Sequence, residues 1–86
     1  MKKKFIFQGK VQSVGFRYAT KMLAEKYNLA GWVENNNDGS VTLVIEGLEE
    51  NMESLINNLK DYFKNNIESI EESIEKDDGL IGFEIK

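Results

Sequence analysis

Residues 9–17 read Gly-Lys-Val-Gln-Ser-Val-Gly-Phe-Arg, with one glycine at the start and another two positions before Arg17. The segment lies between an alternating apolar stretch and an amphipathic one, which predicts a turn from a strand into a helix with Arg17 in its first turn. That turn carries unpaired main-chain N–H groups and the positive end of the helix dipole, so a cation there is unfavourable unless an anion joins it. The segment therefore predicts an anion-binding loop made of main-chain donors and one guanidinium.

Composition narrows the chemistry that such a loop can support. The chain has 86 residues, a length that predicts one domain over residues 1–86, and it contains neither cysteine nor histidine. A thiolate nucleophile, a disulfide framework and the commonest general base and metal ligand are therefore missing. The apolar run Phe5, Ile6 and Phe7 is too short for a signal peptide or a membrane span, so we expect a cytoplasmic protein without a membrane partner.

Charge is distributed unevenly along the chain. The first 26 residues hold seven bases and one acid, a net charge of +6, whereas the remainder holds four lysines and fourteen acids, a net charge of −10. The acidic remainder argues against a nucleic-acid partner, while a small anion at the basic end fits the pattern. For so small and acidic a chain we expect a monomer.

Apolar periodicity predicts the elements that position the loop. Residues 3–8 and 40–46 alternate as strands, residues 16–27 and 52–63 have helical spacing, and residues 29–35 resemble a strand. The Asp38-Gly39 pair predicts a hairpin turn between the second and third strands. A last short strand is expected over residues 81–86. Residues 67–75 fit either a helical face or a strand.

The order of these elements predicts an α+β fold. The simplest architecture is a ferredoxin-like βαββαβ sandwich, with an antiparallel sheet, two helices on one face and an extra short C-terminal strand. Phe16 and Trp32 are interpreted as core residues. We interpret the four glutamates Glu68, Glu71, Glu72 and Glu75 as a solvated face and not as a metal site.

Two blocks of the first half resemble the signature blocks of the acylphosphatases, and residues 83–85 resemble the end of that family's sequences. The residues that carry the resemblance are Gly9, Val11, Gln12, Val14, Phe16 and Arg17, then Gly31, Trp32, Val33, Asn35, Asp38 and Gly39. Two blocks with an eighteen-residue separation between Arg17 and Asn35 make a specific match. The resemblance also favours a strand around residues 70–74.

The resemblance implies hydrolysis of acyl phosphates, which are mixed anhydrides of a carboxylic acid and phosphoric acid, without metal or cofactor. The leaving carboxylate is a weak base, so the reaction asks mainly for charge stabilisation and alignment. By the family's pattern Arg17 binds the phosphoryl group, and its planar fork suits two phosphoryl oxygens. Asn35 orients the attacking water. The main-chain N–H groups of the loop assist Arg17; the residues concerned are Gln12, Ser13, Val14, Gly15 and Phe16.

Simpler roles compete with these assignments. Arg17 on a helix surface can be merely solvated, and Asn35 precedes Asn36 and Asn37 in a turn-forming segment. Ser13 departs from the family, which usually has glycine there. If this position is left-handed, the serine costs roughly 1–2 kcal/mol, and we then expect reduced activity.

Two other functions fit parts of the pattern. Acylphosphatase-like domains also occur inside larger maturation enzymes that handle carbamoyl phosphate, so the chain is alternatively a phosphoryl-binding module with little turnover. A ferredoxin-like RNA binder needs exposed aromatic residues on its central strands. Val41, Leu43 and Ile45 offer none, so this interpretation ranks last.

Overall fold

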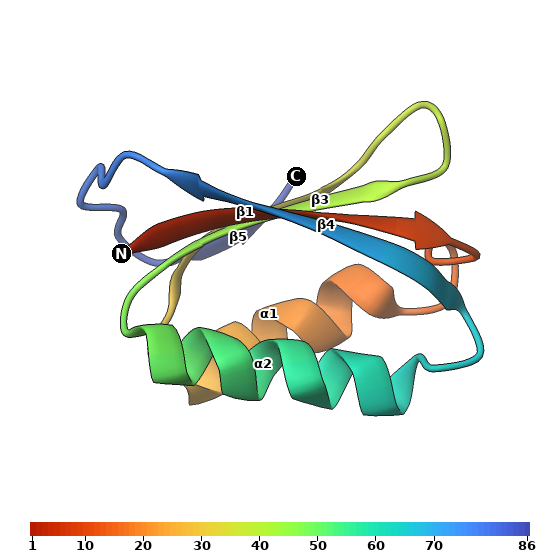
Figure 1. Cartoon of the computed structure of the whole chain (residues 1–86), viewed down its shortest axis with the longest axis horizontal. Helices are drawn as coiled ribbons and strands as arrows, with labels where there is room; N and C mark the ends of the chain where they lie inside the picture. The colour runs from red at the N-terminus through yellow and green to blue at the C-terminus, as the bar shows by residue number, and fades with distance from the viewer.

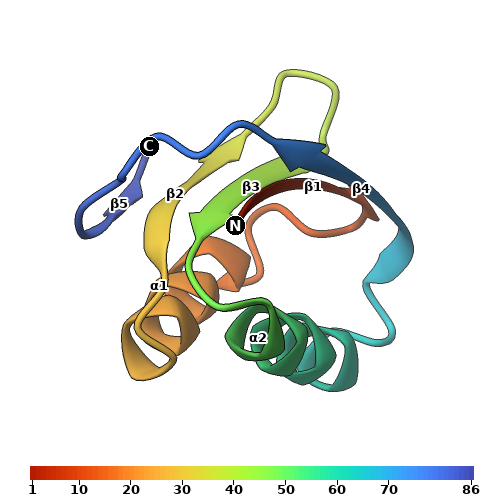
Figure 2. The same cartoon turned by 60° about the vertical axis from the view of Figure 1, so that its left-hand side comes forward.

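A sheet with both helices on one of its faces forms the fold (Figures 1 and 2). The computed structural model describes residues 1–86. In chain order the elements are β1 (Lys2–Gly9), α1 (Phe16–Lys26), β2 (Ala30–Asn35), β3 (Val41–Glu46), α2 (Glu49–Tyr62), β4 (Ile67–Glu75) and β5 (Phe83–Ile85). Neither helix has the length and apolar character needed to cross a membrane.

The strand order is β4-β1-β3-β2-β5. β1 pairs antiparallel with β3 and β4, and β2 pairs antiparallel with β3. This arrangement confirms the predicted ferredoxin-like α+β fold, and it confirms the strand interpretation of residues 67–75. β5 is parallel to β2, so the sheet is mixed where the sequence predicted an antiparallel one.

The core lies between the sheet and the helices. Alternation places Phe5 and Phe7 of β1 toward the helices, and the two side chains are at most 2% exposed. The apolar stripe of α2, including Met52, Leu55 and Leu59, packs against the same layer. Phe16 is buried as predicted, but Trp32 is half-buried outside this cluster. Because Val33 points toward the helices, its neighbour Trp32 lies on the opposite face, where the Lys86 ammonium sits 4.4 Å from its ring centre.

The predicted hairpin joins β2 to β3. The Asp38 carboxylate accepts hydrogen bonds from the main-chain N–H of Ser40 at 2.9 Å and from its hydroxyl at 2.6 Å. These bonds lower the pKa of Asp38, and the bond from the Ser40 hydroxyl is the larger cause. The Asn36 amide donates to the side-chain oxygens of Ser40 and Thr42. Side chains therefore fix the shape of this turn close to Asn35.

The acidic residues of β4 are mostly exposed, and one of them is used in an ion pair. Glu72 accepts a hydrogen bond from the nearly buried Lys3 ammonium at 2.9 Å, and Glu49 at the start of α2 accepts another at 2.9 Å. These two bonds raise the pKa of Lys3, and the bond to Glu72 is the larger cause. The pair of bonds ties α2 and β4 to the central strand β1.

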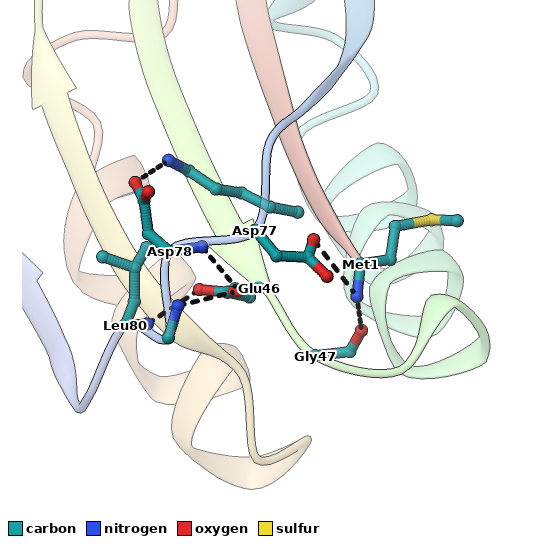
Figure 3. A network of polar contacts seen from close by, with 8 residues as sticks. Met1, Glu46, Gly47, Asp77, Asp78 and Leu80 are labelled. Atoms are coloured by element: carbon teal, nitrogen blue, oxygen red, sulfur yellow. Dashed lines mark hydrogen bonds and ion pairs between the residues drawn. The ribbon is translucent and has the colours of Figure 1, made fainter.

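The connection between β4 and β5 is fastened by one carboxylate. Glu46, at the end of β3, accepts hydrogen bonds from the main-chain N–H groups of Leu80, Gly79 and Asp78 at 2.7, 3.1 and 3.0 Å (Figure 3). The bond from Leu80 is the first cause of the lowered pKa of Glu46. Lys2 adds an ion pair to Asp78 beside it. One side chain thereby anchors the segment that leads into β5.

We expect Glu46→Gln to lower the free energy of unfolding at pH 7, because an amide replaces a charged acceptor of these bonds. The folded pKa of Glu46 is lowered, so its contribution is fully present above the unfolded value of about 4.3 and is lost as pH falls through the folded pKa. The difference in the free energy of unfolding between wild type and Glu46→Gln should therefore shrink as pH falls through that acidic range. Urea denaturation at several pH values measures this difference.

Glu53→Gln on the exposed side of α2 is the matched control, because the Glu53 carboxylate makes no hydrogen bond or ion pair. An equal loss of stability in the two variants at pH 7 would contradict the anchoring role of Glu46.

Candidate active site

The loop between β1 and α1 presents a row of unpaired main-chain donors. Gly15 precedes α1 with a left-handed φ of 81°, no side chain caps the helix, and its first turn contains no acidic residue. The N–H groups of residues 12–18 donate to no acceptor in the protein; the first paired donor is Ala19, to the Gly15 carbonyl. A row of N–H groups at a helix N-terminus forms a binding surface for an anion.

The start of this loop is held close to the beginning of β4. At Gly9 a side chain would put Cβ 2.2 Å from the Asn66 carbonyl oxygen, so only glycine allows this approach. The Lys10 N–H donates to that carbonyl at 2.9 Å, and the Asn66 amide donates back to the Lys10 carbonyl at 3.0 Å. The main chain is therefore fixed just before the row of donors begins.

The Gln12 side chain joins the loop to the β2–β3 hairpin. Its amide nitrogen donates to the Asn36 carbonyl at 2.7 Å and to the Ser40 carbonyl at 2.9 Å. The sequence assigned Gln12 to the loop by its main-chain N–H, and this N–H has no acceptor in the protein. Because the side chain binds the hairpin, Gln12 has only this N–H to offer an anion.

Arg17 lies in the first turn of α1, with its guanidinium directed to the end of the sheet. Its Nη1 donates to the main-chain oxygen of Lys86 at 2.9 Å, and one turn later the Lys21 ammonium donates to the Phe83 carbonyl at 2.8 Å. A guanidinium has five N–H donors in a rigid fork, so this bond fixes its orientation and leaves the other donors available.

Asn35 is the last residue of β2 and carries an unusual acceptor. Its side-chain oxygen Oδ1 is buried and has no hydrogen-bond partner, the only such side-chain atom in the structure. An acceptor kept away from solvent without a donor costs about 1–3 kcal/mol, so buried polar atoms are nearly always paired. This acceptor can therefore pair with a donor of a bound molecule.

These groups meet at one hollow of about 180 Å³. Its wall contains four predicted loop or catalytic residues beside Arg17, namely Ser13, Gly15, Phe16 and Asn35. Val14 is exposed and, like Gln12, is not part of the wall. Val11, Tyr18 and Ile85 complete it, and the sequence did not single them out as site residues. The position of Tyr18, an aromatic residue beside Arg17 in the helix, could have indicated a place in the site. The pattern of the last strand gave no indication that Ile85 lines it.

Ser13 has a left-handed backbone, with φ 63°. For a residue with a Cβ this conformation costs roughly 1–2 kcal/mol. Ser13 therefore has the left-handed conformation for which we expected strain in the loop, and it lies on the wall of the hollow itself.

The electrostatics of the hollow favour an anion. Its wall contains one guanidinium and no carboxylate, and five of the seven residues with an unpaired main-chain N–H line it. No cluster of three or more histidine, cysteine, aspartate or glutamate residues is present anywhere in the structure. Arg17, the N–H groups and Asn35 can together bind a tetrahedral oxyanion and orient a neutral molecule next to it.

Sequence comparisons identify relatives of the chain. A family model described as acylphosphatase matches residues 3–85. The acylphosphatase of Bacillus licheniformis is 47% identical over 53 residues, which cover 62% of this chain and 59% of the relative. The acylphosphatase of Bacillus subtilis is 46% identical over 57 residues, which cover 66% of this chain and 63% of the relative. The matched segment thus spans about three fifths of the length of these curated relatives.

Solved structures extend the similarity to the whole fold. The crystal structure of the Bacillus subtilis acylphosphatase superposes with a TM-score of 0.88 and 34% identity, covering 99% of this chain and 97% of the other. The crystal structure of full-length HypF in its phosphate- and nucleotide-bound form superposes with a TM-score of 0.86 and 31% identity. The match covers 99% of this chain and 11% of HypF. With a family match across 83 of 86 residues, the chain belongs to the acylphosphatase family.

Proposed function

We propose that the protein hydrolyses acyl phosphates to a carboxylate and inorganic phosphate. The observation that carries the proposal is the convergence on one hollow of Arg17, a row of unpaired N–H groups and the buried, unpaired Oδ1 of Asn35. The first two suit the phosphoryl group, and the third suits a water molecule that donates a hydrogen bond. Family membership supports the same reaction.

In the proposed reaction the oxygen of a water molecule attacks phosphorus while the bond from phosphorus to the acyl oxygen breaks. The carboxylate leaves with the electron pair, and the water proton ends on phosphate or in solvent. Arg17 and the main-chain donors offset the charge on the phosphoryl oxygens, which is the main requirement of a loose transition state. Asn35 orients the water without removing its proton. Since the leaving group is a weak base, no general acid is required.

The alternative is a module that binds a phosphoryl group with little turnover. The likeness to HypF favours it, because this chain matches a segment that makes up 11% of a far longer protein. Rate measurements with acetyl phosphate separate the two proposals, because a module binds phosphate without hydrolysing the substrate.

Several expectations about the protein in the cell stay predictions. These are a single domain over residues 1–86, a cytoplasmic location, a monomeric state, and the lack of a nucleic-acid or membrane partner. They rest on length, charge distribution and the short apolar runs of the sequence.

Arg17→Ala tests the proposed hydrolase. We expect kcat for benzoyl phosphate to fall by at least about 10²-fold, the typical effect of removing one preorganised donor to a developing charge. Steady-state kinetics measures the rate, and circular dichroism checks the fold.

Lys21→Ala is the matched control for the Arg17 variant. Lys21 is also on α1 and donates to the Phe83 carbonyl of β5, as Arg17 does to Lys86 just after β5, but Lys21 does not line the hollow. Its rate should stay near wild type. Full activity in folded Arg17→Ala would overturn the proposal, and equal losses in both variants would mean that Arg17 acts by holding β5.

Ser13→Gly tests the strain in the loop. Glycine adopts a φ of 63° without the cost that Ser13 bears, so we expect kcat for acetyl phosphate to rise. Ser13→Ala keeps the strain and lacks the hydroxyl, and it should match wild type. A rate that is unchanged or lower in the glycine variant would reject the strain account; a loss in both variants would assign the hydroxyl a part in binding.

The rate should depend little on pH near neutrality. No histidine or cysteine is present, and the groups with shifted pKa values move away from neutrality, with Asp38 and Glu46 lowered and Lys2 and Lys3 raised. We therefore expect kcat to stay nearly constant between about pH 6 and 8. A bell-shaped profile centred in that range would reveal an acid or base that the proposed mechanism lacks.

A further inference from the structure

Tyr18 belongs to two hollows at once. It lines the hollow that contains Arg17 and Asn35, and it lines a larger groove between α1 and α2. Its side chain is 66% exposed, so it forms a shared wall and is not part of the core. The larger groove therefore borders the proposed phosphoryl site at Tyr18.

The groove has the size and lining of an apolar binding surface. Its volume is about 570 Å³, and its main residues are Tyr18, Met22 and Leu23 from α1 and Asn58, Asp61 and Tyr62 from α2. A cavity of about 150 Å³ holds a benzene ring, so space is not limiting. Met22 and Tyr62 are 52% and 76% exposed. Such large apolar side chains gathered in one concave surface are typical of ligand grooves.

The fold aligns the groove with the site. α1 begins, and α2 ends, at the same end of the molecule (Figure 1), where the rings of Phe16 and Phe63 pack 5.1 Å apart. Tyr18 and Met22 are one helical turn apart and face the same side of α1. A chain that starts at the phosphoryl hollow and passes Tyr18 therefore meets Met22 next.

We propose that this groove binds the acyl group of the substrate, and that Tyr18 makes the enzyme prefer apolar or aromatic acyl groups over acetyl. The inference rests on the proposed hydrolase function, since it assigns the other end of the same substrate. The phosphoryl hollow alone gives no preference among acyl groups, because its polar groups all address the phosphate and the water.

The polar residues of the groove restrict its occupant further. Asp61 is an exposed carboxylate on the groove wall, and no basic residue lines the groove. A second negative charge at the far end of the acyl group is therefore disfavoured, and a neutral acyl chain or ring is favoured. The enzyme should discriminate against succinyl phosphate relative to butanoyl phosphate.

The test is kcat/KM for acetyl, butanoyl, hexanoyl and benzoyl phosphate. In the wild type we expect kcat/KM to rise with acyl size, and Tyr18→Ala to lower the benzoyl-to-acetyl ratio by about 10-fold, as for the loss of one apolar contact in a pocket. Met22→Ala should remove the rise in kcat/KM between butanoyl and hexanoyl phosphate. Ile81→Ala is the control, because Ile81 is 96% exposed and lies outside the groove. Its ratios should equal those of the wild type.

The outcomes separate the inference from the function on which it rests. Hydrolysis of all four substrates with equal ratios in wild type and Tyr18→Ala would overturn the groove assignment and leave the hydrolase intact. No hydrolysis of any substrate by the wild type would overturn the hydrolase itself. If Tyr18→Ala leaves the ratios unchanged but converts a dimer to a monomer in sedimentation experiments, the groove binds a second copy of the chain and the inference is wrong.

Discussion

The two hydrogen bonds from the Gln12 side chain are the contact on which the site depends. They connect the loop that carries the unpaired donors to the hairpin that follows Asn35. Without this link the loop and the hairpin would be related only through the sheet beneath them. Because a neutral amide meets two main-chain carbonyls, the link adds no charge that competes with a bound anion. The Gln12 side chain, which does not line the hollow, thus helps to set the spacing between the unpaired donors of the loop and Asn35.

The same principle extends to the rest of the loop. Gly9 permits contact with Asn66, and the left-handed Gly15 turns the chain into α1. From Gln12 to Tyr18 the main-chain N–H groups have no acceptor in the protein, so they are available to a bound anion. Ser13, within this row, bears the strain of a left-handed φ.

Much of the architecture is predictable from local patterns. Alternation at Phe5 and Phe7, the Asp38-Gly39 turn and the helical stripe of α2 each point to the element that forms. Residues 67–75 are ambiguous because their isoleucines fit two periods, and the pairing of β4 with β1 resolves the ambiguity. Trp32 was misplaced because aromatic character does not tell which face of a sheet a residue occupies. Its contact with the Lys86 ammonium depends on the pairing of β5 with β2, which no local pattern reveals.

The site was predictable only in part, for a related reason. The positions of Arg17 and Asn35 follow from the order of elements, but their partners do not. The bond from Arg17 to Lys86 and the place of Ile85 in the wall depend on β5 lying parallel to β2. The direction of the Gln12 side chain depends on a hairpin more than twenty residues away. Such contacts are properties of the assembled sheet.

We therefore expect the three-residue strand β5 to dock late during folding. It is short, and its pairing bridges some fifty residues of chain. Lys21 binds it directly, while Glu46 and Arg17 bind the residues on either side of it. Short segments with distant partners are among the last to dock and the first to open. Detachment of β5 would remove Ile85 from the wall of the hollow and release Arg17 from its hydrogen bond to Lys86. It would also expose Phe83, so local opening at this edge would disturb the candidate site and the core together.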